Sequence, residues 1–192
     1  MTKRITVGEQ ARDFSVIDMN GVTHRLENYR DRFLLLSFYR YAACPLCNLR
    51  VHELSQHRAT FERMGLRSLL IFQSPAKSMR RHLERRPMPF PVVADPERRV
   101  YATYGLESSV AGFMVAMVHP RSVLALIKGF MPGKMEGDKL LLPADFIIGP
   151  DLTVRQAYYG RHIGDHMPLG TILATGSTEQ ELPPTKTHEM AL

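Results

Sequence analysis

The run FLLLSFY at residues 33–39 constrains the fold more than any other feature of this sequence. Its nearly continuous apolar side chains predict a strand that is buried on both faces of a sheet. A similar run, LRSLLIF at 66–72, follows a segment with helical apolar spacing at 48–64. Strands that alternate with helices in this way pair in parallel, so the sequence predicts an α/β fold with a central sheet.

Local signals predict the remaining elements. We expect strands at 13–17 and 92–94, helices at 76–86 and 97–104, and a late β-hairpin from 144–149 and 153–159. Between 110 and 135, Val123, Leu124, Ile127, Phe130 and Met131 share one helical face, which favours an extra core-packed helix. The methionines of this segment leave a second interpretation open, in which it covers the site or contacts a second subunit.

With 192 residues, the chain is predicted to form one domain over residues 1–174, followed by a flexible tail at 175–192 with few apolar side chains. No segment approaches the roughly 20 apolar residues of a membrane-spanning helix. The first residues also lack the apolar region of a secretory signal. We therefore expect a cytoplasmic protein and no membrane partner.

The net charge of +6 raises the question of an anionic partner. Basic and acidic residues are interleaved along most of the chain, and the densest basic run, at 80–86, is predicted to be the solvated face of a helix. No nucleic-acid recognition motif accompanies the charge, so nucleic-acid binding is not expected.

The chain has two cysteines, Cys44 and Cys47, in the sequence CPLC just after the strand at 33–39. A zinc site would require two further ligands, and no second cysteine pair exists, so redox chemistry is favoured over metal binding. The expected place is the start of a helix, where the positive end of the helix dipole stabilises a thiolate and Pro45 fits the first turn. Arg40 would lower the thiol pKa further if its side chain turned inward. The alternative is two small buried hydrophobic residues.

Other polar residues are weaker candidates. Arg161, His162, Asp165 and His166 form the motif RHIGDHM, which we interpret as a polar loop before the last helix rather than a metal or catalytic site. His52 and Glu53 are expected to be exposed on the helix that follows the cysteines.

Four segments together resemble the peroxiredoxin-like AhpC/TSA (redoxin) family of the thioredoxin superfamily. They are GEQARDFSVIDMNG, FLLLSFYRYAACPLCNLRVHEL, FPVVADPERRVYATYGL and PADFIIGPDLTVRQAYYG, which cover residues 8–107 and 140–160 in the order of the family. The resemblance implies a thioredoxin fold with a central mixed β-sheet flanked by helices on both faces. It also makes residues around 108–139 an apolar insertion.

The active-site residues depart from the peroxidase pattern of this family. The register places Cys47 on the peroxidatic cysteine, while Cys44 replaces a threonine, Arg40 a proline and Pro143 an arginine. The pair of cysteines and Pro143, a candidate for a cis proline lying against them, are similar to thioredoxin-like reductases instead. Cys47 would attack first in a peroxidase, whereas Cys44 would attack first in thioredoxin-like exchange.

The resemblance implies a thiol-dependent oxidoreductase that reduces peroxides, with the product resolved as a Cys44–Cys47 disulfide. Two alternatives are a protein disulfide reductase and a redox sensor without catalytic activity. The residues that we expect to take part are Cys44, Cys47, Pro143 and Arg40. An external dithiol such as thioredoxin or glutathione would regenerate the protein, no cofactor is required, and a homodimer is an open alternative.

Overall fold

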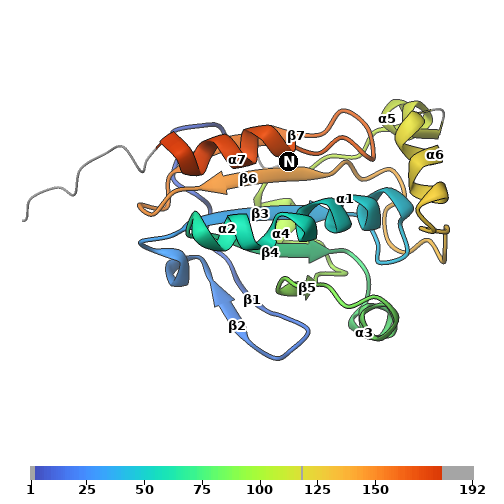
Figure 1. Ribbon diagram of the computed structural model, residues 1–192, viewed down its shortest axis with the longest axis horizontal. Coiled ribbons are helices and arrows are strands. Elements are labelled where there is room, and N and C mark those ends of the chain that lie inside the picture. The colour runs from blue at the N-terminus through green and yellow to red at the C-terminus, as the bar shows by residue number, and fades with distance from the viewer. Residues whose placement is uncertain (1–2, 118, 179–192) are drawn as a thin grey trace, which may run out of the picture.

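The computed structural model describes residues 3–117 and 119–178 of the chain. Its centre is a five-stranded sheet in the order β5-β4-β3-β6-β7 (Figure 1). The strands are β3 (Phe33–Tyr39), β4 (Leu66–Phe72), β5 (Val92–Ala94), β6 (Ala144–Ile148) and β7 (Val154–Tyr159). β3, β4 and β5 are parallel, and β6 is antiparallel to both of its neighbours. The predicted mixed α/β sheet is therefore confirmed.

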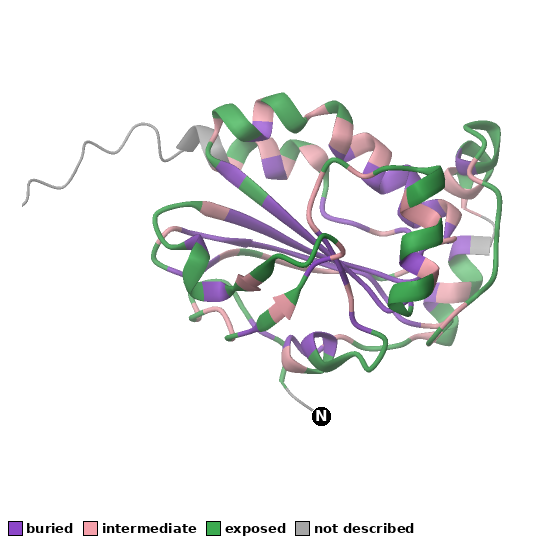
Figure 2. Ribbon diagram, turned by 90° about the horizontal axis from the view of Figure 1, so that it is seen from below, coloured by how far each residue is buried: buried purple, intermediate pink, exposed green. Residues whose placement is uncertain are grey.

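Helices lie on both faces of this sheet. One face is covered by α1 (Pro45–Gln56), α2 (Arg58–Arg63), α3 (Ala76–Arg85) and α7 (Leu169–Thr178), and the other by α4 (Arg99–Thr103). A two-stranded antiparallel hairpin, β1 (Ser15–Ile17) and β2 (Thr23–Arg25), precedes a 3-10 helix at Leu26–Tyr29 on the side of α4. Figure 2 shows that the strands of the central sheet are mostly buried. The order and layers are those of a thioredoxin fold.

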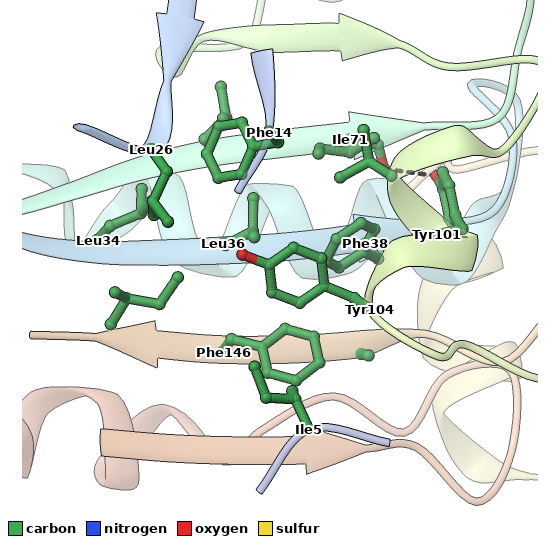
Figure 3. Close-up of a cluster of buried hydrophobic side chains, with 14 of the residues drawn as sticks. Ile5, Phe14, Leu26, Leu34, Leu36, Phe38, Ile71, Tyr101, Tyr104 and Phe146 are labelled. Carbon is green, nitrogen blue, oxygen red and sulfur yellow. Dashed lines mark hydrogen bonds between the residues drawn. The ribbon is translucent and has the colours of Figure 1, made fainter. Parts of the chain in front are cut away.

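Successive side chains of β3 point to opposite faces of the sheet and pack into two separate parts of the interior. Leu36 and Phe38 point to the side of α4, where Phe38 contacts Tyr104 and Phe146 with ring centroids 5.4 Å and 5.9 Å apart (Figure 3). Residues of the opposite parity, among them Leu35 and Tyr39, face α1 and α7. Because β3 is buried on both faces, its carboxyl end holds the following loop against a rigid layer.

The extra helix expected within residues 110–135 is not packed in the core as predicted, because Val123, Leu124, Ile127 and Met131 of its apolar face are exposed. The segment also differs from a single helix. It forms α5 (Val110–Met117) and α6 (Pro120–Ile127), followed by an irregular stretch. Pro120 begins α6 because a proline has no amide hydrogen to lose in a first turn. Gly129, with φ of 77°, lies just after the helix and adopts a left-handed conformation that favours glycine.

Two further boundaries differ from the sequence-based expectation. The helix expected over 48–64 is divided at His57 into α1 and α2. The expected tail from residue 175 begins inside α7, which continues to Thr178. The rest of that tail lies outside the described residues.

Within the described ranges, no single helix is long and apolar enough to cross a bilayer. Val110–Ala116 and Pro120–Ile127 meet that test of length and composition only as a pair, and they are bent by 56°.

Candidate active site

The two cysteines lie where β3 gives way to α1. Cys44 is the N-cap residue of α1, Pro45 occupies the first turn, and the backbone N–H of Cys47 donates to the Cys44 Sγ at 3.5 Å. Both side chains are free thiols and are buried, with 1% of Cys44 and 0% of Cys47 exposed. This is the arrangement in which the amide groups at a helix N-terminus stabilise a thiolate.

Arg40 turns inward beneath the loop that carries Cys44, as the sequence analysis allowed. Its Nη1 lies 3.9 Å from the Cys44 Sγ, and its Nη2 donates to the carbonyl of Lys139. The guanidinium also lies over the rings of Tyr41 and Phe113, at 5.1 Å and 5.7 Å from their centroids. Within the described residues no carboxylate forms a salt bridge with it. The thiolate of Cys44 is thus the anion best placed to compensate this buried cation.

The electrostatic environment distinguishes the two sulfur atoms. Burial opposes ionisation of Cys44, but a hydrogen bond from Cys47, the charge of Arg40 and the backbone N–H groups of Cys47 and Leu46 lower its pKa to about 7. Burial raises the pKa of Cys47 well above its ordinary value, and its hydrogen bond to Cys44 and the negative charge there act in the same direction. The structure therefore favours Cys44 as the thiolate and Cys47 as its thiol partner.

Polar contacts hold the loop before Cys44. The Ala42 N–H donates to the Ser74 Oγ at 2.9 Å, and the Asn48 Nδ2 donates to the carbonyls of Ala42 and Cys44 at 2.7 Å and 2.9 Å. His82 on α3 contacts the Asn48 Oδ1 at 2.9 Å. Ser74, Asn48 and His82 were not predicted from the sequence, because their roles depend on loop geometry rather than on a motif.

Pro143 lies next to the carboxyl end of β3. Ala144 pairs with Phe38, so the preceding Pro143 is level with Tyr39. Pro143 is buried, its carbonyl accepts from the Gly160 N–H at 2.9 Å, and the neighbouring Leu142 packs in the same cluster as both cysteines. The expected cis bond is wrong, because the described chain contains no cis peptide bond. Pro143 nevertheless lies next to the carboxyl end of β3, which agrees with its expected place just before the late strand.

A cavity of about 290 Å³ lies over Cys44. Arg40 and Cys44 are at its base, and most of the wall is apolar: Tyr41, Pro45, Leu46, Phe113, Ala116, Ser122, Leu126, Pro132, Met135 and Ile163. Cys47 does not line it. Six of the twelve lining residues come from α5, α6 and the stretch after α6. The interpretation that residues 110–135 cover the mouth of the site is therefore confirmed.

An ion pair fastens this cover to the helix of the cysteines. The Arg121 Nη2 on α6 lies 2.9 Å and 2.8 Å from the two carboxylate oxygens of Glu53 on α1. The expectation that Glu53 is simply exposed is wrong, because α6 packs on α1 and leaves its side chain only 25% accessible. His52 is half-buried as well, and its ring lies 5.9 Å from that of Phe130.

A buried polar cluster lies behind β3, on the side of α1 and α7. The carboxylate of Asp145 accepts from the Ser37 Oγ at 2.7 Å and the Met167 N–H at 2.7 Å, and it lies 3.0 Å from the His166 Nδ1. Burial opposes the charge of Asp145, but His166, Arg50 and Ser37 together lower its pKa to about 2. An aspartate inside the otherwise apolar strand ADFII was the signal that the sequence analysis did not use.

The motif RHIGDHM does not act as one unit. His166 points into the buried cluster, Asp165 accepts from the Tyr158 hydroxyl at 2.6 Å, and Arg161 is exposed. The His162 ring lies 4.8 Å from that of His119, with the two planes tilted by 33°. Among the described residues, no group of three or more potential ligands is arranged to hold a metal ion.

The sequence is similar to proteins of two kinds. It is 27% identical over 104 residues to a putative peroxiredoxin from Mycobacterium tuberculosis. The match covers 54% of this chain and 66% of that protein. It is 26% identical over 112 residues to the thiol-disulfide oxidoreductase ResA from Geobacillus thermodenitrificans, over 58% of this chain and 64% of the relative. The matched regions thus span less than two thirds of either relative.

The fold is similar to that of peroxiredoxin structures. Peroxidoxin BcpB from Mycobacterium tuberculosis superposes with a TM-score of 0.67 at 18% identity, covering 92% of this chain and 99% of that one. The profile of the AhpC/TSA family matches residues 7–157, a stretch that runs from before β1 into β7 and includes both cysteines. The chain therefore belongs to the AhpC/TSA family.

Proposed function

We propose that this protein is a thiol-dependent oxidoreductase that reduces peroxides, and that Cys44 is the attacking thiolate. The observation that carries this proposal is the place of Cys44 at the base of the apolar cavity, with the Arg40 guanidinium 3.9 Å from its sulfur. Membership of the AhpC/TSA family and the peroxiredoxin relatives support the reaction class.

The chemistry follows from the two thiols. The Cys44 thiolate attacks one oxygen of the peroxide, the O–O bond breaks, and the other oxygen leaves as an alkoxide that takes up a proton to give an alcohol. Cys44 is then a sulfenic acid, and the sulfur of Cys47 displaces its hydroxyl as water to form a disulfide. An external reductant returns the disulfide to two thiols by exchange and is itself oxidised to a disulfide: either one dithiol of the thioredoxin type or two molecules of a monothiol such as glutathione.

This assignment departs from the family register, which places Cys47 on the peroxidatic position. Two features of the site favour Cys44 instead. Cys44 lines the cavity, and the hydrogen bond from Cys47 and the charge of Arg40 lower its pKa, which favours the thiolate. Cys47 is fully buried with a pKa well above the ordinary value, which suits a resolving thiol that reacts only after its neighbour has been oxidised.

Burial of Cys44 also favours a small substrate over a protein disulfide. Only 1% of this residue is exposed, and α5 and α6 cover it. Attack on a disulfide requires the sulfur atoms to approach in line, so a macromolecular disulfide would require the cover to move. An organic hydroperoxide with an apolar body fits the cavity as it stands, because the walls are apolar and the only charged groups lie at the base.

Protein disulfide reduction is the second candidate. It is supported by the CxxC pair at a helix N-terminus with the lower pKa on the first cysteine, and by the similarity to ResA. We propose a reducing compartment, the cytoplasm, for either activity, because the disulfide must be returned to two thiols after each turnover.

Single serine variants of the two cysteines test the proposal. With cumene hydroperoxide, Cys47→Ser should accumulate a sulfenic acid on Cys44 that a dimedone-type probe traps, because the resolving thiol is missing, and Cys44→Ser should be inert. With an oxidised protein substrate, the same Cys47→Ser variant should not accumulate a mixed disulfide. A sulfenic acid on Cys47 in the Cys44→Ser protein would instead support the family register, and a trapped mixed disulfide would support the reductase.

A further inference from the structure

α5 and α6 lie at one end of the molecule (Figure 1). Together with the stretch that follows α6, they carry an exposed apolar surface. We call it the α5–α6 face and define it by Val110, Met114, Val115, Val123, Leu124, Leu126, Ile127, Met131 and Met135. Most of the exposed large hydrophobic residues of the described chain belong to it, and Ile127 is 77% exposed. A soluble monomer rarely presents a contiguous face of this kind without a partner.

The charged residues within the segment that carries this face are all basic. The sequence contains no aspartate or glutamate between Glu107 and Glu136, whereas Lys128 and Lys134 are exposed within that stretch. Arg86, at the end of α3, borders the face, because its Nη2 donates to the Gly129 carbonyl at 2.6 Å and its guanidinium lies 4.7 Å from the centroid of the Phe130 ring. The apolar face thus has lysines at its margin. Of the acids next to it, Glu53 pairs with Arg121, and Glu136 accepts a hydrogen bond from the Ser78 hydroxyl.

The face is continuous with the cavity over Cys44. Leu126 and Met135 line the cavity and are also 44% and 45% exposed, so they form part of its rim. Phe113 and Ala116, on the inner side of α5, complete the apolar wall. A molecule resting on the face would therefore meet an apolar path to the reactive sulfur.

We propose that the α5–α6 face docks this protein on an anionic lipid surface. An apolar face with a basic margin is the pattern of helices that lie in the interface of a membrane. Each helix has 8 residues, about 12 Å at 1.5 Å per residue, so neither can cross a hydrocarbon core of roughly 30 Å. This replaces the expectation that no membrane takes part, which rested only on the lack of a spanning segment.

The charge pattern also argues against a second copy as the occupant. A symmetric dimer through this face would bring Lys128 and Lys134 of two chains toward each other with no acid of the face to compensate them. An anionic lipid surface would instead attract the same lysines. Docking depends on the face alone and stands whether or not Cys44 reduces peroxides.

Co-sedimentation with vesicles tests the docking directly. The full chain should bind vesicles of phosphatidylcholine with phosphatidylglycerol, bind weakly to phosphatidylcholine alone, and be released by added salt as the lysine charges are screened. Ile127→Glu should lower the partition coefficient by about tenfold or more, because it places a charge where an apolar side chain enters the interface.

Ile17→Glu is the matched control, since Ile17 on β1 is 63% exposed and lies outside the face. It should bind as the original protein does, and Cys44→Ser should bind equally well. The proposal is overturned if the original protein stays in solution with anionic vesicles, or if Ile127→Glu binds them as tightly as Ile17→Glu. A dimer in solution that Ile127→Glu dissociates, together with no vesicle binding, would assign the face to a second copy.

Discussion

The Arg40 Nη1 lies 3.9 Å from the Cys44 Sγ inside the protein, where the arginine is only 2% exposed. A buried cation without a carboxylate partner is costly, and a thiolate next to it lowers that cost. The same contact makes the Cys44 sulfur more nucleophilic at neutral pH than a free thiol. The first prediction follows from this pair.

Arg40→Met should raise the pKa of Cys44 from about 7 toward the ordinary value of 9, because it removes the cation next to the sulfur. The rate of alkylation by iodoacetamide at neutral pH should then fall several-fold, because the loss of thiolate outweighs the greater nucleophilicity of a more basic thiolate. The rate should be measured against pH in the Cys47→Ser background, so that one thiol reports. Arg86→Met, which removes an arginine on the surface, should leave the dependence of the alkylation rate on pH unchanged. If Arg40→Met shows the same dependence as the protein with Arg40, then Arg40 does not lower the pKa of Cys44.

Asp145 should make the stability of the protein depend on acid pH. Its pKa is lowered from 3.8 to about 2 in the folded protein, so its contribution is complete above 3.8 and is lost as the pH falls through 2. A shift of this size corresponds to about 2 kcal/mol of the free energy of unfolding. Urea unfolding across this range should show a steeper loss for the original protein than for Asp145→Asn.

Glu27→Gln is the control for the change in net charge, since the Glu27 side chain is 62% accessible and solvent screens its ion pair with Arg25. Its stability should follow the pH dependence of the original protein closely. If Asp145→Asn loses stability with the same slope as the original protein, the carboxylate of Asp145 is not the group that titrates.

The Glu53–Arg121 pair should hold α6 over the site. Glu53→Gln weakens the only salt bridge that the described residues form between α1 and α6, so α6 should exchange its amide hydrogens faster. Cys44 should also react faster with a bulky thiol reagent, because the cover opens more often. Glu62→Gln, which breaks the exposed Arg58–Glu62 pair on α2, should change neither measurement. Slower or equal labelling in Glu53→Gln would mean that apolar packing alone holds α6.

Gly133→Ala should disturb the loop of the cysteines from outside. A Cβ at Gly133 would lie 2.6 Å from the Cβ of Ala43, which precedes Cys44, so one of the two backbones must shift. We expect a loss of about 1–3 kcal/mol in the free energy of unfolding and slower oxidation of Cys44 by peroxide. Gly170→Ala in α7 meets nothing within 4 Å and should be neutral or stabilising.

The sequence predicted the sheet better than the surroundings of the site. β3 and β4 occupy the predicted residues, because a continuous apolar run leaves a buried strand few alternatives. Cys44, Cys47 and Arg40 could be predicted as site residues because they lie between the end of a predicted strand and the start of a predicted helix. The roles of Ser74, Asn48 and Glu53 could not be predicted, since they arise from contacts between elements far apart in the chain. The cis bond at Pro143 was expected from the resemblance alone, and this expectation was wrong.

The apolar cavity should set the preference among peroxides, and the neighbouring positions 126 and 127 separate the cavity from the outer face. Leu126 lines the cavity, whereas Ile127 does not. Leu126→Phe should narrow the space over Cys44 and lower kcat/KM for cumene hydroperoxide by about tenfold, because a bulky apolar body loses contacts worth one to two kcal/mol. Hydrogen peroxide needs no such space, so its kcat/KM should change little. Ile127→Phe adds the same ring outside the cavity and should leave both substrates unaffected. An equal loss for the two peroxides in Leu126→Phe would show that the substitution perturbs the Cys44 sulfur itself, and that the cavity does not select the substrate.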